Sequence, residues 1–484
     1  MKHLLLILLL SLTTVASQAP IFITDSVGPR ARYFLKVNVR TPQEMANYTT
    51  RIQQSGFDVA GSNWRQGIIE VVTDDFGIGK LAQLGLPGFQ RSTPQNIQAA
   101  LDSRYLNPDK VEQALKALNQ KFPQFTKLEQ IGSSNNGRPI WALLISTTPN
   151  MRSSEYYTKP TILFDALHHA REVMTPEVVL DVGLAALNTL ARGQRQAAEL
   201  AARWNIWIVP MLNVDGSDIV WRRDAMWRKN ARAQGNRVFG VDINRNYGFG
   251  WNKCSGSSGS ASAQDYRGPE AASEPETKAL MNLAQQIRPA AYLSYHSFSE
   301  LVLYPYGCRG VLTGENALIA KVANEVAQIL PSDSGRGTYT PGTPWQLLYS
   351  TDGDSMGYMF GEFGAVSFTF EINQSFQPSF DLRGPTVEKH RRAWAYLLNR
   401  FDTNMLTLRI VDGRNRQYSK AQVGISNIPF LQGEKPFRTN SMGHFFKVLD
   451  PGEYTLFAQL ADGRRGEVKV RMSGQAQTVD LIIP

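Results

Sequence analysis

The chain has 484 residues, of which 42% are hydrophobic and 19% are charged, so it is long enough for two or three globular domains. Its formal net charge is +9, but basic and acidic residues are mixed along the chain. Because no basic run is interleaved with aromatic residues, we expect no nucleic-acid partner.

A short apolar segment near the start of the chain predicts export. After a basic start, residues 4–12 are almost all Leu or Ile, and the small residues Ala16 and Ser17 follow. This pattern is typical of a secretory signal peptide, here residues 1–17. The segment is too short to span a membrane, and no other long apolar run follows. We therefore expect a secreted or periplasmic protein without a membrane span.

Residues 18–103 predict a small α+β domain that ends in a linker. The polar connection 87–103 is the expected linker, and it contains Arg91 as a candidate site for proteolysis, with Arg104 just beyond it. The expected elements are strands at 32–39 and 67–73 and helices at 41–54 and 75–84.

Residues 104–402 predict a larger α/β domain with a central mixed, mostly parallel sheet covered by helices on both faces. Thr175 is the expected N-cap of the helix after the first parallel strand, and Ser273 with Glu276 predicts a capping box. The expected strands are 127–131, 139–146, 161–167, 205–212, 291–295 and 365–370, with helices at 107–122, 317–330 and 386–401. Residues 403–484 alternate short strands with Gly and Asp turns, which predicts a β-sandwich.

A polar run follows the strand 161–167, and it contains His169 and Glu172 three positions apart. Chemistry in open α/β sheets lies at the carboxyl ends of strands, and a histidine and a carboxylate at this spacing can hold two corners of a zinc site. Two ligands do not make a site, however, and a polar loop whose histidines only hydrogen-bond gives the same pattern. His168 is the alternative ligand, although only His169 has the spacing to Glu172.

His296 ends another expected strand and is the candidate third ligand. Two histidines and one glutamate leave a fourth zinc position open for water, which is the catalytic pattern. Glu371 also ends a strand and is the candidate general base, although a buried carboxylate paired to an arginine would look the same. Cys254 and Cys308 are the only cysteines, so in an oxidising compartment a disulfide is favoured over two free thiols.

Taken together, these segments resemble the zinc carboxypeptidase family, the relatives of carboxypeptidases A, B and T. The likeness spans about Arg104 to Phe401, in the order of the family's motifs. The carboxypeptidase T branch is the most similar, from Leu167-His-His-Ala-Arg-Glu172 and Tyr349-Ser-Thr-Asp-Gly-Asp354. The other matching segments are Trp227-Arg-Lys229, Val241-Asp-Ile-Asn-Arg-Asn246, His296-Ser-Phe-Ser-Glu-Leu301, Leu303-Tyr-Pro-Tyr-Gly307 and Phe368-Thr-Phe-Glu371.

The resemblance implies a role for each matching residue. One Zn²⁺ per chain would be bound by His169, Glu172 and His296, with Glu371 as general base and acid and Arg228 polarising the scissile carbonyl. Asp242 would orient His169. The remaining roles concern the substrate: Asn244 and Arg245 would clamp its free carboxylate with help from Arg171 and Tyr349, and Met356 and Asp354 would form the specificity pocket.

The first domain is similar to the family's propeptide, which covers the active-site cleft, and the last resembles a transthyretin-like domain. The resemblance therefore implies an exported, monomeric zymogen that removes C-terminal residues, apolar and some basic, from peptides and proteins. Where the family usually has an Asp-Trp pair, this chain has Gly357 and Tyr358, so the pocket wall differs. The alternatives are a zinc amidase acting on cell-wall peptides or acyl amino acids, and a binding module on an inactive peptidase fold.

Overall fold

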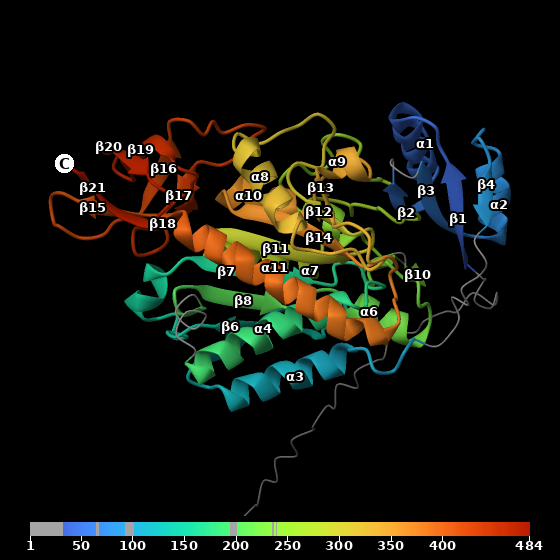
Figure 1. The fold of residues 1–484 in the computed structure, drawn as a ribbon, viewed down its shortest axis with the longest axis horizontal. Helices are drawn as coiled ribbons and strands as arrows, with labels where there is room; N and C mark the ends of the chain where they lie inside the picture. The colour runs from blue at the N-terminus through green and yellow to red at the C-terminus, as the bar shows by residue number, and fades with distance from the viewer. Residues whose placement is uncertain (1–31, 64–66, 92–100, 194–200, 235–236, 239) are drawn as a thin grey trace, which may run out of the picture.

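The computed structural model describes residues 32–63, 67–91, 101–193, 201–234, 237–238 and 240–484. The predicted signal peptide lies outside the described residues, as does the stretch 92–100 of the predicted linker. We call residues 32–91 the N-terminal unit, 101–403 the central unit and 405–483 the C-terminal unit. The N-terminal and C-terminal units lie at opposite ends of the central unit (Figure 1).

An eight-stranded mixed sheet forms the middle of the central unit, in the order β13-β12-β14-β11-β7-β8-β6-β5. Strands β8, β7, β11 and β14 are parallel neighbours, and every residue of β7, β8 and β11 is buried, as parallel strands covered on both faces should be. The predicted α/β fold is confirmed. The bounds are β5 (Thr126–Ser133), β6 (Pro139–Ile145), β7 (Thr161–Ala166), β8 (Asn205–Val209), β11 (Ala291–Ser297), β12 (Leu301–Leu303), β13 (Thr340–Gly342) and β14 (Val366–Ile372).

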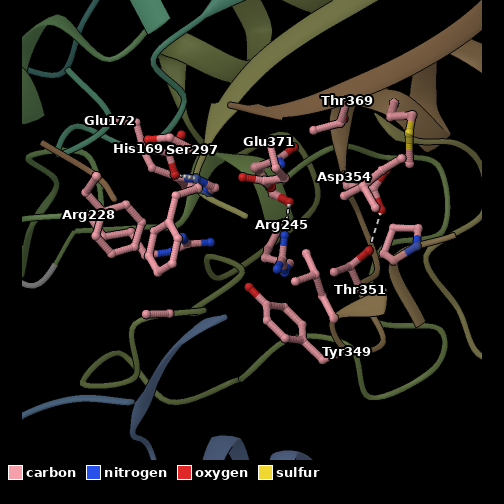
Figure 2. Close-up of a pocket in the computed structure, with 18 residues that line it drawn as sticks. His169, Glu172, Arg228, Arg245, Ser297, Tyr349, Thr351, Asp354, Thr369 and Glu371 are labelled. Atoms are coloured by element: carbon pink, nitrogen blue, oxygen red, sulfur yellow. Dashed lines mark hydrogen bonds and ion pairs between the residues drawn. The ribbon is translucent and has the colours of Figure 1, made fainter. Parts of the chain in front are cut away.

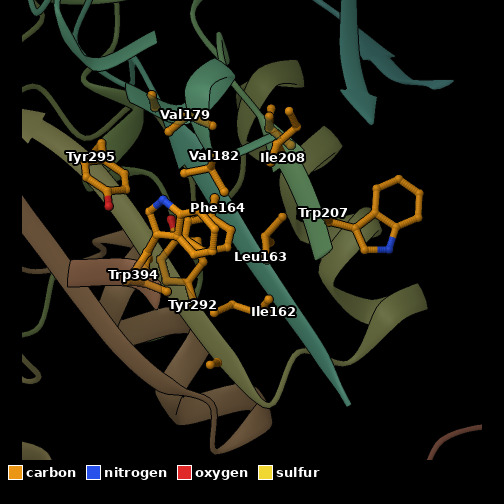
Figure 3. Packing of buried hydrophobic residues seen from close by; sticks show 14 of the residues in the cluster. Ile162, Leu163, Phe164, Val179, Val182, Trp207, Ile208, Tyr292, Tyr295 and Trp394 are labelled. Atoms are coloured by element: carbon orange, nitrogen blue, oxygen red, sulfur yellow. The ribbon is translucent and has the colours of Figure 1, made fainter. Parts of the chain in front are cut away.

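Helices α4 and α11 lie side by side across one face of this sheet (Figure 1). Phe164 of β7 meets Trp394 of α11 edge to face, with ring centroids 6.5 Å apart (Figure 3). Gly183 brings α4 close to β8, because a Cβ there would lie 2.6 Å from Ile208 Cδ1. No helix in the described part of the chain is long and apolar enough to cross a membrane. The helices are α3 (Pro108–Lys121), α4 (Thr175–Arg192), α6 (Val214–Arg222), α7 (Pro275–Ile287), α8 (Asn316–Ala327), α9 (Pro344–Leu347), α10 (Ser355–Phe363) and α11 (Arg383–Thr403), with 3₁₀ turns η1 (Ser154–Thr158), η2 (Ile243–Arg245) and η3 (Phe380–Leu382).

The N-terminal unit is a four-stranded antiparallel sheet, in the order β2-β3-β1-β4, with two helices. Thr41 caps the first helix by accepting a hydrogen bond from Glu44 N, as its Thr-Pro start predicts. Part of the predicted linker is a strand instead, because Phe89 packs on the core of this unit and pairs with Val37. The bounds are β1 (Arg32–Asn38), α1 (Pro42–Gln54), β2 (Asp58–Asn63), β3 (Ile68–Asp74), α2 (Asp75–Ala82) and β4 (Phe89–Arg91).

The C-terminal unit is a β-sandwich, as the sequence predicts. A three-stranded sheet, β18-β15-β21, packs on a four-stranded sheet, β17-β16-β19-β20. One apolar cluster joins the two sheets, with Leu408 from β15 and Val423 and Leu456 from the other sheet. The bounds are β15 (Met405–Asp412), β16 (Ala421–Ile425), β17 (Phe437–Arg438), β18 (His444–Val448), β19 (Gly452–Leu460), β20 (Arg465–Met472) and β21 (Gln477–Ile483).

Two predicted helix caps are wrong. Thr175 is the first residue of α4 rather than its N-cap, and its hydroxyl donates to the carbonyl of Glu172. The N-cap of α7 is Glu274, so Ser273 and Glu276 form no capping box. The carboxylate of Glu276 instead accepts hydrogen bonds from asparagines of neighbouring loops, because these buried amides need acceptors.

Candidate active site

A strained turn at the end of β7 directs the polar segment that contains His169 and Glu172 into the candidate active site. Leu167 has φ of 58°, a left-handed conformation that costs a non-glycine residue roughly 1 kcal/mol. Neighbouring loops hold the strained backbone: Asn213 N donates to Leu167 O at 3.1 Å, and Ala170 N donates to Arg228 O at 2.9 Å. These hydrogen bonds therefore hold the residues that follow β7 in a fixed position.

His169, Glu172 and His296 converge at the carboxyl ends of β7 and β11. His169 Nδ1 lies 2.7 Å from Glu172 Oε1, and His296 Nδ1 lies 3.1 Å from Glu172 Oε2. The two imidazole Nδ1 atoms are 3.1 Å apart. All three side chains are buried. Among the described residues, they form the cluster whose ligand atoms lie close enough together to bind one metal ion.

The chemistry of this group fits zinc. Burial lowers the pKa of His169, and it lowers the pKa of His296 to about 3, so both rings are neutral and have lone pairs to donate. In a tetrahedral site with bonds of about 2.1 Å, neighbouring ligand atoms lie roughly 3.4 Å apart, close to the separations found here. Two facing nitrogen lone pairs beside a carboxylate are best satisfied by a cation between them. Three protein ligands leave one corner of the tetrahedron for water or substrate.

Asp242 fixes the orientation of the first ligand. Its Oδ1 lies 3.2 Å from His169 Nε2, so that ring nitrogen can carry the proton and leave Nδ1 free for a metal. Its Oδ2 accepts from Arg228 Nη2 at 2.8 Å and Nε at 3.2 Å. The backbone N–H of Asn244 also donates to Oδ1, at 3.0 Å. One buried carboxylate thus joins the ligand His169 to the side chain of Arg228 and to the backbone of Asn244.

His168, the alternative ligand, lies outside the metal-binding group. Its Nε2 is 2.8 Å from Tyr247 Oη, and its ring stacks on His296 with centroids 5.2 Å apart. Nearby, Asp165 accepts hydrogen bonds from Tyr292 and Ser294, and burial raises its pKa to about 7. Sequence reasoning missed this network beneath His296. The alternation of side chains along β11 was an available signal, because it puts Tyr292, Ser294 and His296 on one face.

Glu371 lies beside His296, since the two residues are in register on the parallel strands β14 and β11. Figure 2 shows its side chain in the same cavity as His169 and Glu172. Burial raises the pKa of Glu371 well above its usual range, and the Glu172 carboxylate raises it further. A carboxyl group of raised pKa next to a metal site is suited to accept and return protons near neutral pH.

Asn244, Arg245 and Tyr349 lie in the same cavity as Glu371 (Figure 2). Asn244 Oδ1 accepts from Ser355 N at 2.9 Å, which leaves its Nδ2 group as the donor for a ligand. The guanidinium of Arg245 lies 6.0 Å from the centre of the Tyr349 ring. Arginine and amide donors grouped in this way match a carboxylate.

The predicted specificity residues Met356 and Asp354 also line this cavity, with Leu303 and Thr351. Asp354 is the N-cap of α10: its Oδ1 accepts from Gly357 N at 2.7 Å, and its Oδ2 accepts from Thr351 Oγ1 at 2.9 Å. Met356, Leu303 and Leu301 form a small apolar cluster. The sequence missed Thr369, which shares a face of β14 with Glu371 and so was open to prediction from the alternation of side chains.

Arg171 does not line the cavity. Its guanidinium is fully buried and forms a two-pronged ion pair with Asp58 of the N-terminal unit, in which Nη2 donates to Oδ1 at 3.0 Å and Nη1 to Oδ2. It also lies over the ring of Phe376, at 3.9 Å. Cys254 and Cys308 are joined as a disulfide beside the cavity, where Thr351 N donates to Gly307 O at 3.0 Å.

Comparisons with known proteins agree with this geometry. The sequence model of the family described as "Zinc carboxypeptidase" matches residues 111–391, more than half of the chain. Mast cell carboxypeptidase A of Homo sapiens is 29% identical over 275 residues, which cover 56% of this chain and 63% of that protein. Carboxypeptidase B of Canis lupus familiaris is 30% identical over 294 residues, which cover 59% of this chain and 68% of that protein.

A solved structure shows the same fold. Carboxypeptidase A from Helicoverpa armigera has a TM-score of 0.66 at 24% identity, and the match covers 76% of this chain and 98% of that one. The similarity to the carboxypeptidase T branch is tested by none of these matches and stays a prediction.

Proposed function

Because the chain belongs to the zinc carboxypeptidase family of hydrolases, whose members remove C-terminal residues, we propose that it is an exported zymogen acting on the C-termini of peptides and proteins. The observation that carries the proposal is one cavity with a metal-binding group and a carboxylate clamp together. The three metal ligands come from one chain, so the proposed metal site needs no residue from a second copy. An amidase or an endopeptidase has no need to bind a terminal carboxylate, so the clamp argues against the amidase alternative.

The proposed roles follow from the position of each side chain. His169, Glu172 and His296 would hold one zinc ion, which when bound supplies a Lewis acid for water and the scissile carbonyl. Glu371 would take a proton from the attacking water and return it to the leaving amine. Arg228 would donate to the developing oxyanion. The clamp residues that would hold the substrate carboxylate are Asn244, Arg245 and Tyr349.

The metal assignment is tested by elemental analysis of the purified protein. We expect one zinc per chain, loss of peptidase activity after chelation, and recovery on adding zinc back. Protein that purifies with no metal and cleaves peptides in the presence of a chelator would contradict the assignment.

We propose that the N-terminal unit, within residues 18–103, is an inhibitory prodomain. Ala60 lines the catalytic cavity, and the space that remains is about 40 Å³. A space of that size holds only a few water molecules, since each needs roughly 10–15 Å³, so Ala60 narrows the room for a substrate side chain. Ser62 Oγ donates to the carbonyl of Leu348, and the ring of Tyr349 packs against the core of this unit.

Replacing Asp58 by Asn is expected to weaken this inhibition, because it leaves the buried guanidinium of Arg171 without its charge partner. Breaking one side of a buried ion pair costs about 3–5 kcal/mol, so the uncut variant should be at least about tenfold more active than the uncut wild type. After proteolysis between Arg91 and Arg104, the two proteins should be equally active. Peptidase assays before and after limited proteolysis make the comparison.

Asp75→Asn is the matched control, since Asp75 lies in the same unit but pairs with the exposed Arg91. It should leave the latency unchanged. An uncut wild type that is already fully active would disprove the prodomain role. When Asp58 leaves with the cut unit, Arg171 becomes available, and we propose that it then assists the clamp.

We propose a preference for apolar C-terminal residues with some tolerance of basic ones. Met356 and Leu303 give the pocket an apolar lining, and methionine adapts to side chains of different shape. Asp354 supplies a carboxylate to the same cavity, although its oxygens also cap α10 and accept from Thr351. Its charge, rather than a free oxygen, would attract a lysine or arginine side chain.

Asp354→Asn separates the capping of α10 from the attraction of a basic side chain. Asparagine is as good a helix N-cap as aspartate, but it carries no charge. We expect kcat/KM to fall about tenfold for peptides ending in Lys or Arg and to stay unchanged for those ending in Leu or Phe. A panel of peptides that differ only in the last residue measures this. A wild type that cleaves only basic or only acidic C-termini would overturn the pocket assignment.

A further inference from the structure

A wide groove lies where the central and C-terminal units meet, and we call it the junction groove. Its volume is about 640 Å³, and it is lined by Arg288, Lys420 and Arg438 together with amide and hydroxyl side chains such as Gln285, Gln422 and Asn440. A smaller adjoining pocket shares both arginines and adds Lys159. Of the described residues that line either space, none is acidic. Basic and acidic residues are interspersed along the chain, so a groove lined by several basic side chains and no acidic one is unusual for this protein.

The two arginines lie close enough to repel each other. Burial and the neighbouring guanidinium of Arg438 together lower the pKa of Arg288 to about 10, and the nearby carboxylate of Glu362 offsets only part of this effect. Among the described residues, neither arginine forms an ion pair, and Arg288 Nε donates only to the main-chain carbonyl of Arg438, at 3.3 Å. Bringing like charges together in a groove costs free energy, which an anionic ligand would recover.

The groove is a fixed part of the fold. Lys447 of the C-terminal unit is buried in the interface, where its Nζ donates to Glu315 Oε2 at 2.5 Å and to Gly364 O at 2.7 Å. Asn440, which lines the groove, also donates to Tyr157 O across the interface, at 2.7 Å. The two units are therefore held together by buried polar contacts, and the groove keeps its shape.

The groove lies far from the proposed active site. Its adjoining pocket contains Thr161 and Asn205, the first residues of β7 and β8, whereas the metal-binding group lies past the opposite ends of the strands. Six residues of β7 span roughly 20 Å. The N-terminal unit, at the far end of the molecule from the C-terminal unit, does not cover the groove (Figure 1). A ligand there would not obstruct the catalytic cavity, whether or not the N-terminal unit has been cut off.

We propose that the junction groove binds an acidic polysaccharide, which would hold the enzyme on a glycan-rich surface while its cavity stays free. Pockets of a few hundred Å³ suit ligands much larger than a single inorganic anion. Guanidinium groups match the carboxylate or sulfate groups of such a glycan, and the amide and hydroxyl side chains match its sugar hydroxyls. Single-stranded nucleic acid is disfavoured, because Tyr157 is the one aromatic side chain in the lining of the groove.

Calorimetric titration of the full-length protein tests the proposal with four probes. Hexagalacturonate and a heparin-derived hexasaccharide carry carboxylate and sulfate groups on sugars, maltohexaose is neutral, and polyphosphate carries charge alone. We expect the two acidic glycans to bind, maltohexaose not to bind, and polyphosphate to bind more weakly than the glycans. The Arg438→Gln/Lys420→Gln variant changes two exposed side chains and should weaken glycan binding by about tenfold or more.

The matched control is Lys469→Gln/Arg471→Gln, which removes the same charge from exposed positions of β20. It should bind the glycans as the wild type does, and both variants should keep the unfolding midpoint and the peptidase activity of the wild type. The proposal is wrong if neither acidic glycan binds, if polyphosphate binds as tightly as they do, or if the two variants lose affinity equally.

Discussion

Replacing Glu371 by glutamine should leave zinc bound and lower kcat/KM by about a hundredfold or more. The side chain keeps its size but can no longer accept a proton from water. Glu371 is not one of the proposed metal ligands, which are His169, Glu172 and His296, so the metal content should not change. The readouts are peptide hydrolysis and elemental analysis on the same preparation.

The stability of this variant gives a second readout. Burial and the charge of Glu172 raise the pKa of Glu371, which means that its ionised form destabilises the folded, metal-free protein. The neutral amide should therefore leave the thermal unfolding midpoint of metal-free protein unchanged or higher. Glu388→Gln, on the exposed side of α11, is the control for a lost carboxylate and should change neither activity nor metal content. Near wild-type turnover, or a variant without zinc, would refute the role of Glu371.

Replacing Arg245 by glutamine should lower kcat/KM by about a hundredfold for peptides with a free C-terminus. Arg245 is the guanidinium that lines the cavity beside Asn244 and Tyr349, and its Nε has no hydrogen-bond partner among the described residues. Truncating one partner of a buried charge pair costs about 2–5 kcal/mol. The loss should appear mainly in KM, because the carboxylate is held in the ground state and the transition state alike.

Arg309→Gln is the matched control, since Arg309 is exposed. It should keep the kinetics of the wild type on every peptide. If Arg245→Gln cleaves free-acid peptides as fast as the wild type, the clamp has been assigned to the wrong residue. An equal loss with C-terminally amidated peptides would show that the guanidinium serves something other than a carboxylate.

Much of the site could be predicted because it lies at the ends of buried strands. His169, His296 and Glu371 each follow or end a run of apolar residues, and parallel strands bring such ends to one edge of a sheet. The register of β11 with β14 sets His296 beside Glu371. The spacing of His169 and Glu172 also distinguishes His169 from His168, whose ring is used to support His296 instead.

Features that depend on distant contacts could not be predicted. Arg171 follows His169 by two positions and looks like part of the clamp, but its partner Asp58 lies 113 positions away in another unit. The sequence predicts a linker where β4 lies. This short segment is a strand only because it pairs with β1, and that pairing cannot be seen in the local sequence. The caps of α4 and α7 were misassigned because buried loop amides and carbonyls compete for the same polar side chains.

The central claim is that this protein removes residues from free C-termini. It is tested most directly by digesting a peptide that ends in Leu and its C-terminally amidated twin with protein cut between Arg91 and Arg104. Mass spectra recorded over time should show the free-acid peptide losing single residues from its C-terminus, while the amidated twin stays intact. Cleavage of internal bonds, or equal cleavage of both peptides, would contradict the claim.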